Sequence, residues 1–214
     1  MLLVPMIDVA DANNYTSVIE YMHEVQKNEV ACVNWPELYP SRPEVAFKIA
    51  HNGTHLFLQF FVEENEILAE ASEDNGPVWK DSCVEFFMSF GDSLHYYNLE
   101  VSCIAKVLLG YRENKANSEH ASPALLSSIK RYPSLGTEPI GRRQGDFKWN
   151  VLIVVPVSAY WQSGLETFRG VKARGNFYKC GDNLTIPHYL SWNPVETKTP
   201  NFHMPLYFGD IYFE

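Results

Sequence analysis

The sequence has few cysteines and no cysteine pattern typical of a metal site. Its four cysteines form no CxxC pair, and no histidine pair lies near them at metal-ligand spacing; they are Cys32, Cys83, Cys103 and Cys180. This spacing argues against a structural zinc site. We therefore expect free thiols, most of them buried, in preference to disulfides.

The chain also lacks an excess of positive charge. It has 17 Lys+Arg against 26 Asp+Glu, and its formal net charge of −9 argues against nucleic acid and anionic membranes as partners, since both bind basic surfaces. The GxSxG, P-loop and dinucleotide-binding motifs are missing. With 46% hydrophobic and 20% charged residues, the composition excludes a disordered chain.

No apolar run approaches the ~18–20 residues that a membrane-spanning helix requires. The first apolar stretch ends at Asp8, carries no basic residue and is too short for a secretion signal. As written, the sequence predicts a cytoplasmic chain, or the mature or truncated form of an exported protein. It shows no repeat or linker, so we expect one domain over residues 1–214, with residues 1–28 as an N-terminal extension packed on it.

Aromatic residues are abundant (13 Phe, 12 Tyr and 5 Trp), and many lie in short, β-branched or aromatic segments. Residues 45–50 and 55–62 flank Asn52-Gly53 and predict a β-hairpin with a type I′ turn, because Asn and Gly tolerate positive φ. Residues 83–90 and 95–103 predict a second pair of strands. Further segments of this kind cover residues 104–111, 147–155, 170–179, 188–192 and 206–213.

Helix signals are few. Ser122 is a candidate N-cap, Pro123 follows it in the first turn, and a short apolar stripe comes next. Residues 15–26 have a weaker helical pattern. Many short strands separated by Pro, Gly and Asn are typical of all-β proteins. The sequence therefore predicts an antiparallel, jelly-roll-like β-sandwich with one or two short helices.

The second strand pair holds the strongest local indication of a site. Alternation along residues 83–90 puts Val84, Phe86 and Met88 on the core face and Glu85 on the other. If this hairpin closes in the simplest register, Glu85 lies opposite Glu100. Like charges across a ladder cost up to ~1 kcal/mol, so such a pair needs a cation, hydrogen-bond donors or a polar ligand. The alternative is a solvated sheet face with Lys or Arg neighbours.

Two tryptophans lie beside turn sequences. Trp79 follows the turn at residues 75–78, and Trp192 precedes Asn193-Pro194. Indole rings in such places can stack on the apolar faces of sugar rings, and packing at the sheet rim is the alternative for each. The remaining tryptophans are assigned to packing; they are Trp35, Trp149 and Trp161.

Three other groups of polar residues have weaker signals. The acidic run 63–66 could supply oxygen ligands to calcium, but it lacks an EF-hand pattern, and a solvated loop is the preferred interpretation. His188 and His203 have no metal-ligand partners nearby in sequence, so we expect structural hydrogen bonds for both. Arg142 and Arg143 could bind a carboxylate or a sugar hydroxyl, or be exposed charges.

Five motifs in order make the chain resemble the family 9 carbohydrate-binding modules, and more closely the family 9-like group of polysaccharide-degrading bacteria. These motifs are residues 75–87, 97–100, 176–182, 187–194 and 201–203. The resemblance extends over residues 29–214. It implies a β-sandwich related to the DOMON-type fold and a part in polysaccharide catabolism through binding.

In well-studied members of that family, two tryptophans hold the reducing-end sugar of a glycan, and polar side chains bind its hydroxyls. The resemblance implies Trp79 as the first tryptophan, Glu85 as the hydroxyl-binding carboxylate and Trp192 as the second tryptophan. Further candidates are Asn98, Glu100 and Asn193. The resemblance also implies structural calcium, for which the sequence indicates no ligands. We expect a monomer whose partner is an oligosaccharide or polysaccharide.

We therefore predict non-catalytic binding of an end of a plant-type polysaccharide or oligosaccharide. One alternative is a glycoside hydrolase that uses Glu85 and Glu100, since retaining enzymes separate two carboxyls by roughly 5–5.5 Å, which this register allows. Against it, both would lie on one flat sheet face without the apolar pocket that raises a general acid's pKa. The other alternative is a protein-interaction domain that kept the fold.

Overall fold

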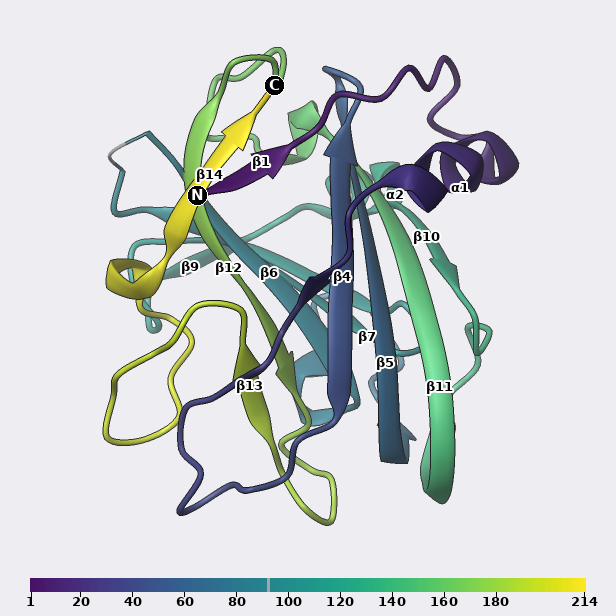
Figure 1. Cartoon of the computed structure of the whole chain (residues 1–214), viewed down its shortest axis with the longest axis vertical. Coiled ribbons are helices and arrows are strands. Elements are labelled where there is room, and N and C mark those ends of the chain that lie inside the picture. Colours follow the sequence, from purple (N-terminus) through teal and green to yellow (C-terminus); the bar gives the residue numbers. More distant parts are fainter. Residues whose placement is uncertain (92) are drawn as a thin grey trace.

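The structure, a computed structural model, describes residues 1–91 and 93–214 and consists of two β-sheets packed face to face (Figure 1). Its strands are β1 (Leu2–Val4), β2 (Asn28–Glu29), β3 (Cys32–Val33), β4 (Glu44–His51), β5 (His55–Ala69), β6 (Cys83–Phe90), β7 (Tyr96–Ser102), β8 (Val107–Arg112), β9 (Ser118–His120), β10 (Lys130–Pro133), β11 (Ile140–Pro156), β12 (Lys172–Cys180), β13 (Tyr189–Ser191) and β14 (Gly209–Phe213). The α-helices are α1 (Tyr15–Glu24) and α2 (Pro123–Ser128), and the short 3-10 helices are η1 (Val78–Lys80), η2 (Val157–Ala159) and η3 (Pro205–Tyr207).

The larger sheet has nine strands, with the order β1-β14-β12-β6-β7-β8-β9 and with β13 pairing both β12 and β3. The smaller sheet has five strands in the order β10-β11-β5-β4-β2. The strand pairs in both sheets are antiparallel except β1–β14, which joins the two ends of the chain in parallel (Figure 1). The predicted antiparallel sandwich with short helices is confirmed. Among the described residues, no helix is both long and apolar enough to cross a membrane.

The main core lies between the sheets and is centred on stacked phenylalanines. Phe177 of β12 stacks on Phe47 of β4 with 3.6 Å between ring centroids, and on Phe86 of β6 with 4.4 Å. Val84 and Met88 point into the same core, so the predicted core face of β6 is confirmed. The alternation of β6 therefore sends Glu85 to the outer face of the larger sheet.

The outer faces of both sheets are covered. Helix α1 packs Val18 and Met22 over the smaller sheet, and its N-cap is Asn14, whose side chain accepts a hydrogen bond from the Ser17 N–H. On the larger sheet, a second apolar cluster joins strand residues such as Phe87 to Phe202 and Phe208 of the C-terminal segment. This C-terminal cover turns the outer face of β6 into an interior.

The predicted hairpins form, and one turn differs from expectation. In the β4–β5 connection Gly53 has φ 97°, but Asn52 does not have positive φ, whereas a type I′ turn needs positive φ at two positions. The Asn52 carboxamide instead accepts the His55 N–H. The β6–β7 pair has the predicted register, with Glu85 opposite Glu100. Ser122 caps α2 as predicted, by accepting the Leu125 N–H.

Candidate functional site

A pocket of about 310 Å³ opens on the covered outer face of the larger sheet. Its floor comes from the adjacent strands β12, β6, β7 and β8, and its walls come from η1 and the loops after β8, β12 and β13. The lining residues are Trp79, Glu85, Glu100, Arg112, Lys115, Cys180, Asp182, Tyr189, Pro200, Asn201, Phe202 and His203. Charged groups of both signs and aromatic rings thus meet in a space suited to a small ligand.

The glutamate pair predicted from the register lies on the floor of this pocket. Glu85 and Glu100 are each only 3% exposed, so the alternative of a solvated sheet face is wrong. Pattern alone could not show this, because the cover comes from residues 195–208, more than ninety positions along the chain. In the described part of the chain, neither carboxylate has a Lys or Arg within ion-pair distance.

A chain of hydrogen bonds orients Glu100. Arg112 Nε donates to Asn98 Oδ1 (2.7 Å), which leaves the Asn98 amide to donate to Glu100 Oε1 (2.7 Å). The other oxygen, Glu100 Oε2, is buried and has no hydrogen-bond partner among the described residues. Gly110, opposite Asn98 on β8, makes room for this arrangement, since a Cβ there would lie 2.5 Å from Asn98 Oδ1.

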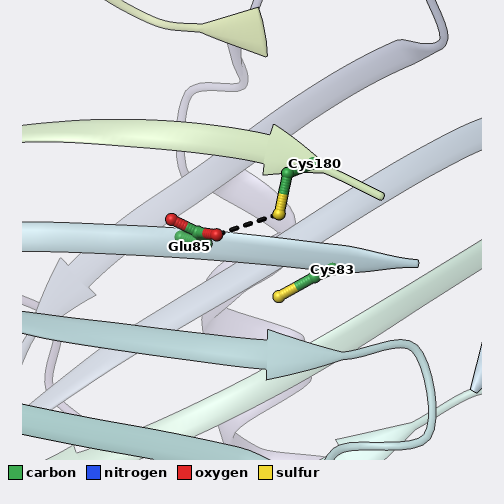
Figure 2. A group of neighbouring side chains, drawn as sticks. All are labelled: Cys83, Glu85 and Cys180. Atoms are coloured by element: carbon green, nitrogen blue, oxygen red, sulfur yellow. Dashed lines mark hydrogen bonds between the residues drawn. The ribbon is translucent and has the colours of Figure 1, made fainter. Parts of the chain in front are cut away.

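Glu85 is held in a different way. Its hydrogen bond within the described residues comes from the Cys180 thiol, whose Sγ lies 2.9 Å from Glu85 Oε1 (Figure 2). Cys83 lies beside them on the same face of β6. The structure has free thiols at all four cysteines, three of them buried, as predicted.

Burial dominates the protonation of the pocket carboxyls. Burial, and then the charge of Glu100, raise the pKa of Glu85 well above its usual value. Burial raises the pKa of Glu100 to about 7, although the hydrogen bond from Asn98 opposes this. The expectation of a flat face without an apolar pocket is therefore wrong, because Phe202 and the other covering residues desolvate both groups.

The structure separates the predicted site residues into two groups. Trp79, in η1, lines the pocket and is 36% exposed, while Asn98 lies behind Glu100. Trp192 and Asn193 do not line the pocket. Trp192 packs edge-on against Phe47 and Phe177 of the main core, and Asn193 binds Asn176 through its backbone. The remaining tryptophans are packed, as predicted.

The sequence reasoning assigned none of Arg112, Asp182 and His203 to the site, and for His203 it expected only a structural hydrogen bond. Arg112 ends the third strand of the β6–β7–β8 meander, and its contact with Asn98 depends on the register of β8. Asp182 and His203 fall within the motifs at 176–182 and 201–203, which was the available signal. Burial raises the pKa of Asp182 and lowers that of His203 to about 3, where the charges of Arg112 and Lys115 add to the effect.

The acidic run 63–66 is part of strand β5, so the preferred interpretation as a solvated loop is wrong. Glu63 pairs with Lys148, Glu64 with Lys179, and Glu66 with Arg142. Carboxylates held by cations of the chain do not fit a calcium site, which needs them as ligands. His188 contacts Lys179 Nζ (2.8 Å), and His203 contacts the Tyr96 hydroxyl (2.9 Å), so the expected structural hydrogen bonds are confirmed.

A two-sheet sandwich with a small polar pocket and an exposed tryptophan defines a ligand-binding β-module, and comparisons with known proteins refine this class. The sequence model of carbohydrate-binding family 9 matches residues 16–213. The chain therefore belongs to carbohydrate-binding family 9, as its motifs indicated. A search of curated proteins finds no match.

Solved structures agree with this assignment. A protein from Bacteroides uniformis ATCC 8492, for which carbohydrate binding has been suggested, is 38% identical, with a TM-score of 0.95 over 100% of this chain and 98% of its own. Two structures of a family 9 module from Caldicellulosiruptor kristjanssonii share the fold at 11% and 10% identity, with TM-scores of 0.59 and 0.61. They cover 100% of this chain and 95% and 93% of their own, and contain glucose and cellotriose respectively.

Proposed function

We propose that the pocket binds an end of a plant-type polysaccharide or oligosaccharide without cleaving it. The observation that carries this proposal is Trp79, 36% exposed, beside two buried carboxyl groups in one small pocket. A sugar ring has an apolar face for an indole and hydroxyls for charged acceptors and donors. The glucose and cellotriose in the two Caldicellulosiruptor complexes support a β-glucan end as the first ligand to test.

The residues around the pocket bind different parts of the sugar. Trp79 supplies the stacking surface, and Glu85 and the free Oε2 of Glu100 accept hydrogen bonds from hydroxyls. Arg112 lines the same pocket and donates to sugar oxygens, while Asn98 fixes Glu100. A volume of about 310 Å³ is at the lower end of small-molecule pockets, which favours a terminal sugar over the middle of a long chain.

Calorimetry against cello- and xylo-oligosaccharides, each also in its borohydride-reduced form, tests the proposal. We expect Trp79→Ala to weaken binding by about 2 kcal/mol, roughly thirtyfold in Kd, because it removes the stacking surface. Trp192→Ala is the informative comparison. Unchanged affinity there supports a pocket with Trp79 alone, and an equal loss supports a clamp of two tryptophans. Full affinity in Trp79→Ala would contradict both versions.

Hydrolysis of a glycosidic bond is the second candidate, and the raised pKa values of Glu85 and Glu100 favour it. A retaining glycosidase needs one protonated and one ionised carboxyl, and two coupled buried carboxyls can share a proton in this way. The two candidates differ in product. Binding predicts no reducing sugar above the blank from a polysaccharide panel, whereas hydrolysis predicts release that Glu85→Gln and Glu100→Gln each abolish.

A further inference from the structure

Three potential metal ligands converge at the floor of the pocket. Cys83 and Glu85 are two residues apart on β6 and share a face, and Cys180 is the direct partner of Cys83 on β12. The two Sγ atoms and the carboxylate oxygen all lie within 4.8 Å of one another (Figure 2). The strand register fixes this convergence, because it places all three side chains on one side of two neighbouring strands.

The donor set has a defined preference among metals. Two thiolates and one carboxylate suit Zn²⁺ and related thiolate-binding ions, and do not suit calcium, which takes oxygen ligands. Two sulfurs in a tetrahedral zinc site lie about 3.8 Å apart when each Zn–S bond is about 2.3 Å. The two sulfurs lie no more than 4.8 Å apart, so they would approach by at most about an ångström to reach that separation.

The two pocket carboxylates have no direct cationic partner in the part of the chain that the structure describes, although Arg112 and Lys179 lower their pKa values from a longer distance. The hydrogen bond to Glu85 comes from a thiol, Glu100 Oε2 is unpartnered, and no Lys or Arg pairs with either group within residues 1–91 and 93–214. An unpaired buried carboxylate is costly, and that cost is relieved by a proton, as the raised pKa values of both groups indicate, or by a bound cation. By contrast, the buried carboxylate of Glu64 in β5 pairs with Lys179, a cation of the same chain.

The position of the cluster leaves one side of an ion accessible. Glu85 and Cys180 line the pocket, whereas Cys83 does not, so the three protein ligands would bind an ion from the side of the β-sheet. Zinc sites with three protein ligands keep the fourth position for water or another ligand. Here that position would face the pocket.

We propose that Cys83, Glu85 and Cys180 bind a Zn²⁺-like ion whose fourth coordination position faces the pocket. Binding replaces the protons of the two thiols and the proton that the raised pKa of Glu85 retains on its carboxyl, and all of these pass to solvent. This inference goes beyond sugar binding and does not depend on it, although both involve Glu85. The cysteine spacing in the sequence argued against zinc because the two thiols come from strands 97 residues apart and meet only through the β6–β12 register.

The test uses the whole chain, kept reduced and freed of metal, with Co²⁺ as a spectroscopic probe and Zn²⁺ as competitor. We expect a thiolate-to-cobalt charge-transfer band that one equivalent of Zn²⁺ removes. Adding azide should shift the visible cobalt bands, because the fourth position is open. A wild-type protein without the band overturns the site, and bands that azide leaves unchanged overturn the open position.

Matched variants assign the ligands. Cys83→Ser and Cys180→Ser should lose the band, and Cys32→Ser, the same exchange at a half-buried thiol outside the cluster, should keep it. A band that survives in either cluster variant overturns the assignment. If a serine variant fails to fold by circular dichroism, Glu85→Gln retains both thiols. Loss of a group that only hydrogen-bonds to a metal ligand weakens metal binding by about 10–100-fold. Because Glu85 is proposed as a ligand itself, Glu85→Gln should weaken Zn²⁺ binding by more than this, and an unchanged Kd overturns the proposal.

The readouts also separate this inference from the proposed function. Metal binding is measured without sugar, and sugar binding is measured on metal-free protein. Sugar binding without a cobalt band refutes the metal site alone. A cobalt band without sugar binding refutes the sugar proposal alone.

Discussion

Glu64 of β5 and Glu85 of β6 are both buried carboxylates in the same sandwich, but their surroundings differ. Glu64 pairs with Lys179 Nζ at 2.9 Å and accepts the Trp149 indole N–H at 2.7 Å. Glu85 has a thiol for a neighbour and a second carboxylate, Glu100, across the ladder. Glu64 therefore has a cation of the chain beside it, although its Oε2, like Glu100 Oε2, accepts no hydrogen bond from the described residues, whereas Glu85 and Glu100 have no Lys or Arg within ion-pair distance there.

The difference separates a structural cluster from the cluster that we propose binds a ligand. Lys179 is fully buried and also donates to the Cys180 carbonyl, so its cluster ties β12 to β5 across the core. The pocket cluster holds two carboxylates that repel each other, and in the described chain no Lys or Arg lies within ion-pair distance of either. Groups arranged in this way reduce stability, and a bound ligand that uses them would offset that cost.

The largest effect should come from breaking the pair of Glu64 and Lys179. Lys179→Met removes the only ion-pair partner that Glu64 has among Lys and Arg in the described residues, and leaves a buried charge. We expect a loss of about 3–5 kcal/mol in the free energy of unfolding, measured by urea denaturation. Adding Glu64→Gln to Lys179→Met should recover much of that loss. A single variant within about 1 kcal/mol of wild type would refute the structural role of the pair.

Gly110→Ala should perturb the pocket through the orienting chain. The new Cβ would lie 2.5 Å from Asn98 Oδ1, so the asparagine must move and its bonds to Arg112 and Glu100 must weaken. We expect a loss of about 1–3 kcal/mol in stability together with weaker sugar binding. Gly141→Ala is the matched control, because a Cβ there meets nothing within 4 Å. Equal effects of the two exchanges would show that the Asn98 contact is unimportant.

The sequence allowed prediction of the sandwich and of the Glu85–Glu100 pair, because strand alternation and hairpin register are local properties. The pocket depends on tertiary contacts that no local pattern shows. Residues near 202 fold back over β6, and Arg112 reaches Asn98 only in the observed β7–β8 register. Trp192 illustrates the same limit: its place beside a turn was correctly predicted, but its ring packs toward the core.

Mild acid should lower the stability of the protein through His203, which lines the pocket. Burial, Arg112 and Lys115 lower the pKa of His203 to about 3, while the unfolded value is near 6.5. The stability that the neutral ring contributes is therefore present above pH 6.5 and lost as the pH falls toward 3. About 1.4 kcal/mol should be lost per pH unit in that range. Urea titrations at several pH values should show this dependence reduced in His203→Gln and unchanged in exposed His23→Gln, and an unaltered dependence in His203→Gln would contradict the assignment.

The smallest expected effect has the opposite sign to that of Lys179→Met. Glu100→Gln removes a buried negative charge with an unpartnered oxygen and eliminates repulsion with Glu85. In metal-free protein at neutral pH we expect the free energy of unfolding to rise by about 1 kcal/mol, because burial disfavours the charge of Glu100 more than the Asn98 hydrogen bond and the Arg112 charge favour it. The same variant should bind sugar more weakly, since the hydroxyl acceptor is lost. Glu166→Gln, at an exposed position, controls for the exchange. If Glu100→Gln were instead destabilised, Glu100 would be a stabilising structural group, as Glu64 is. The proposed binding function of the pocket would then lose the difference between the two clusters that supports it.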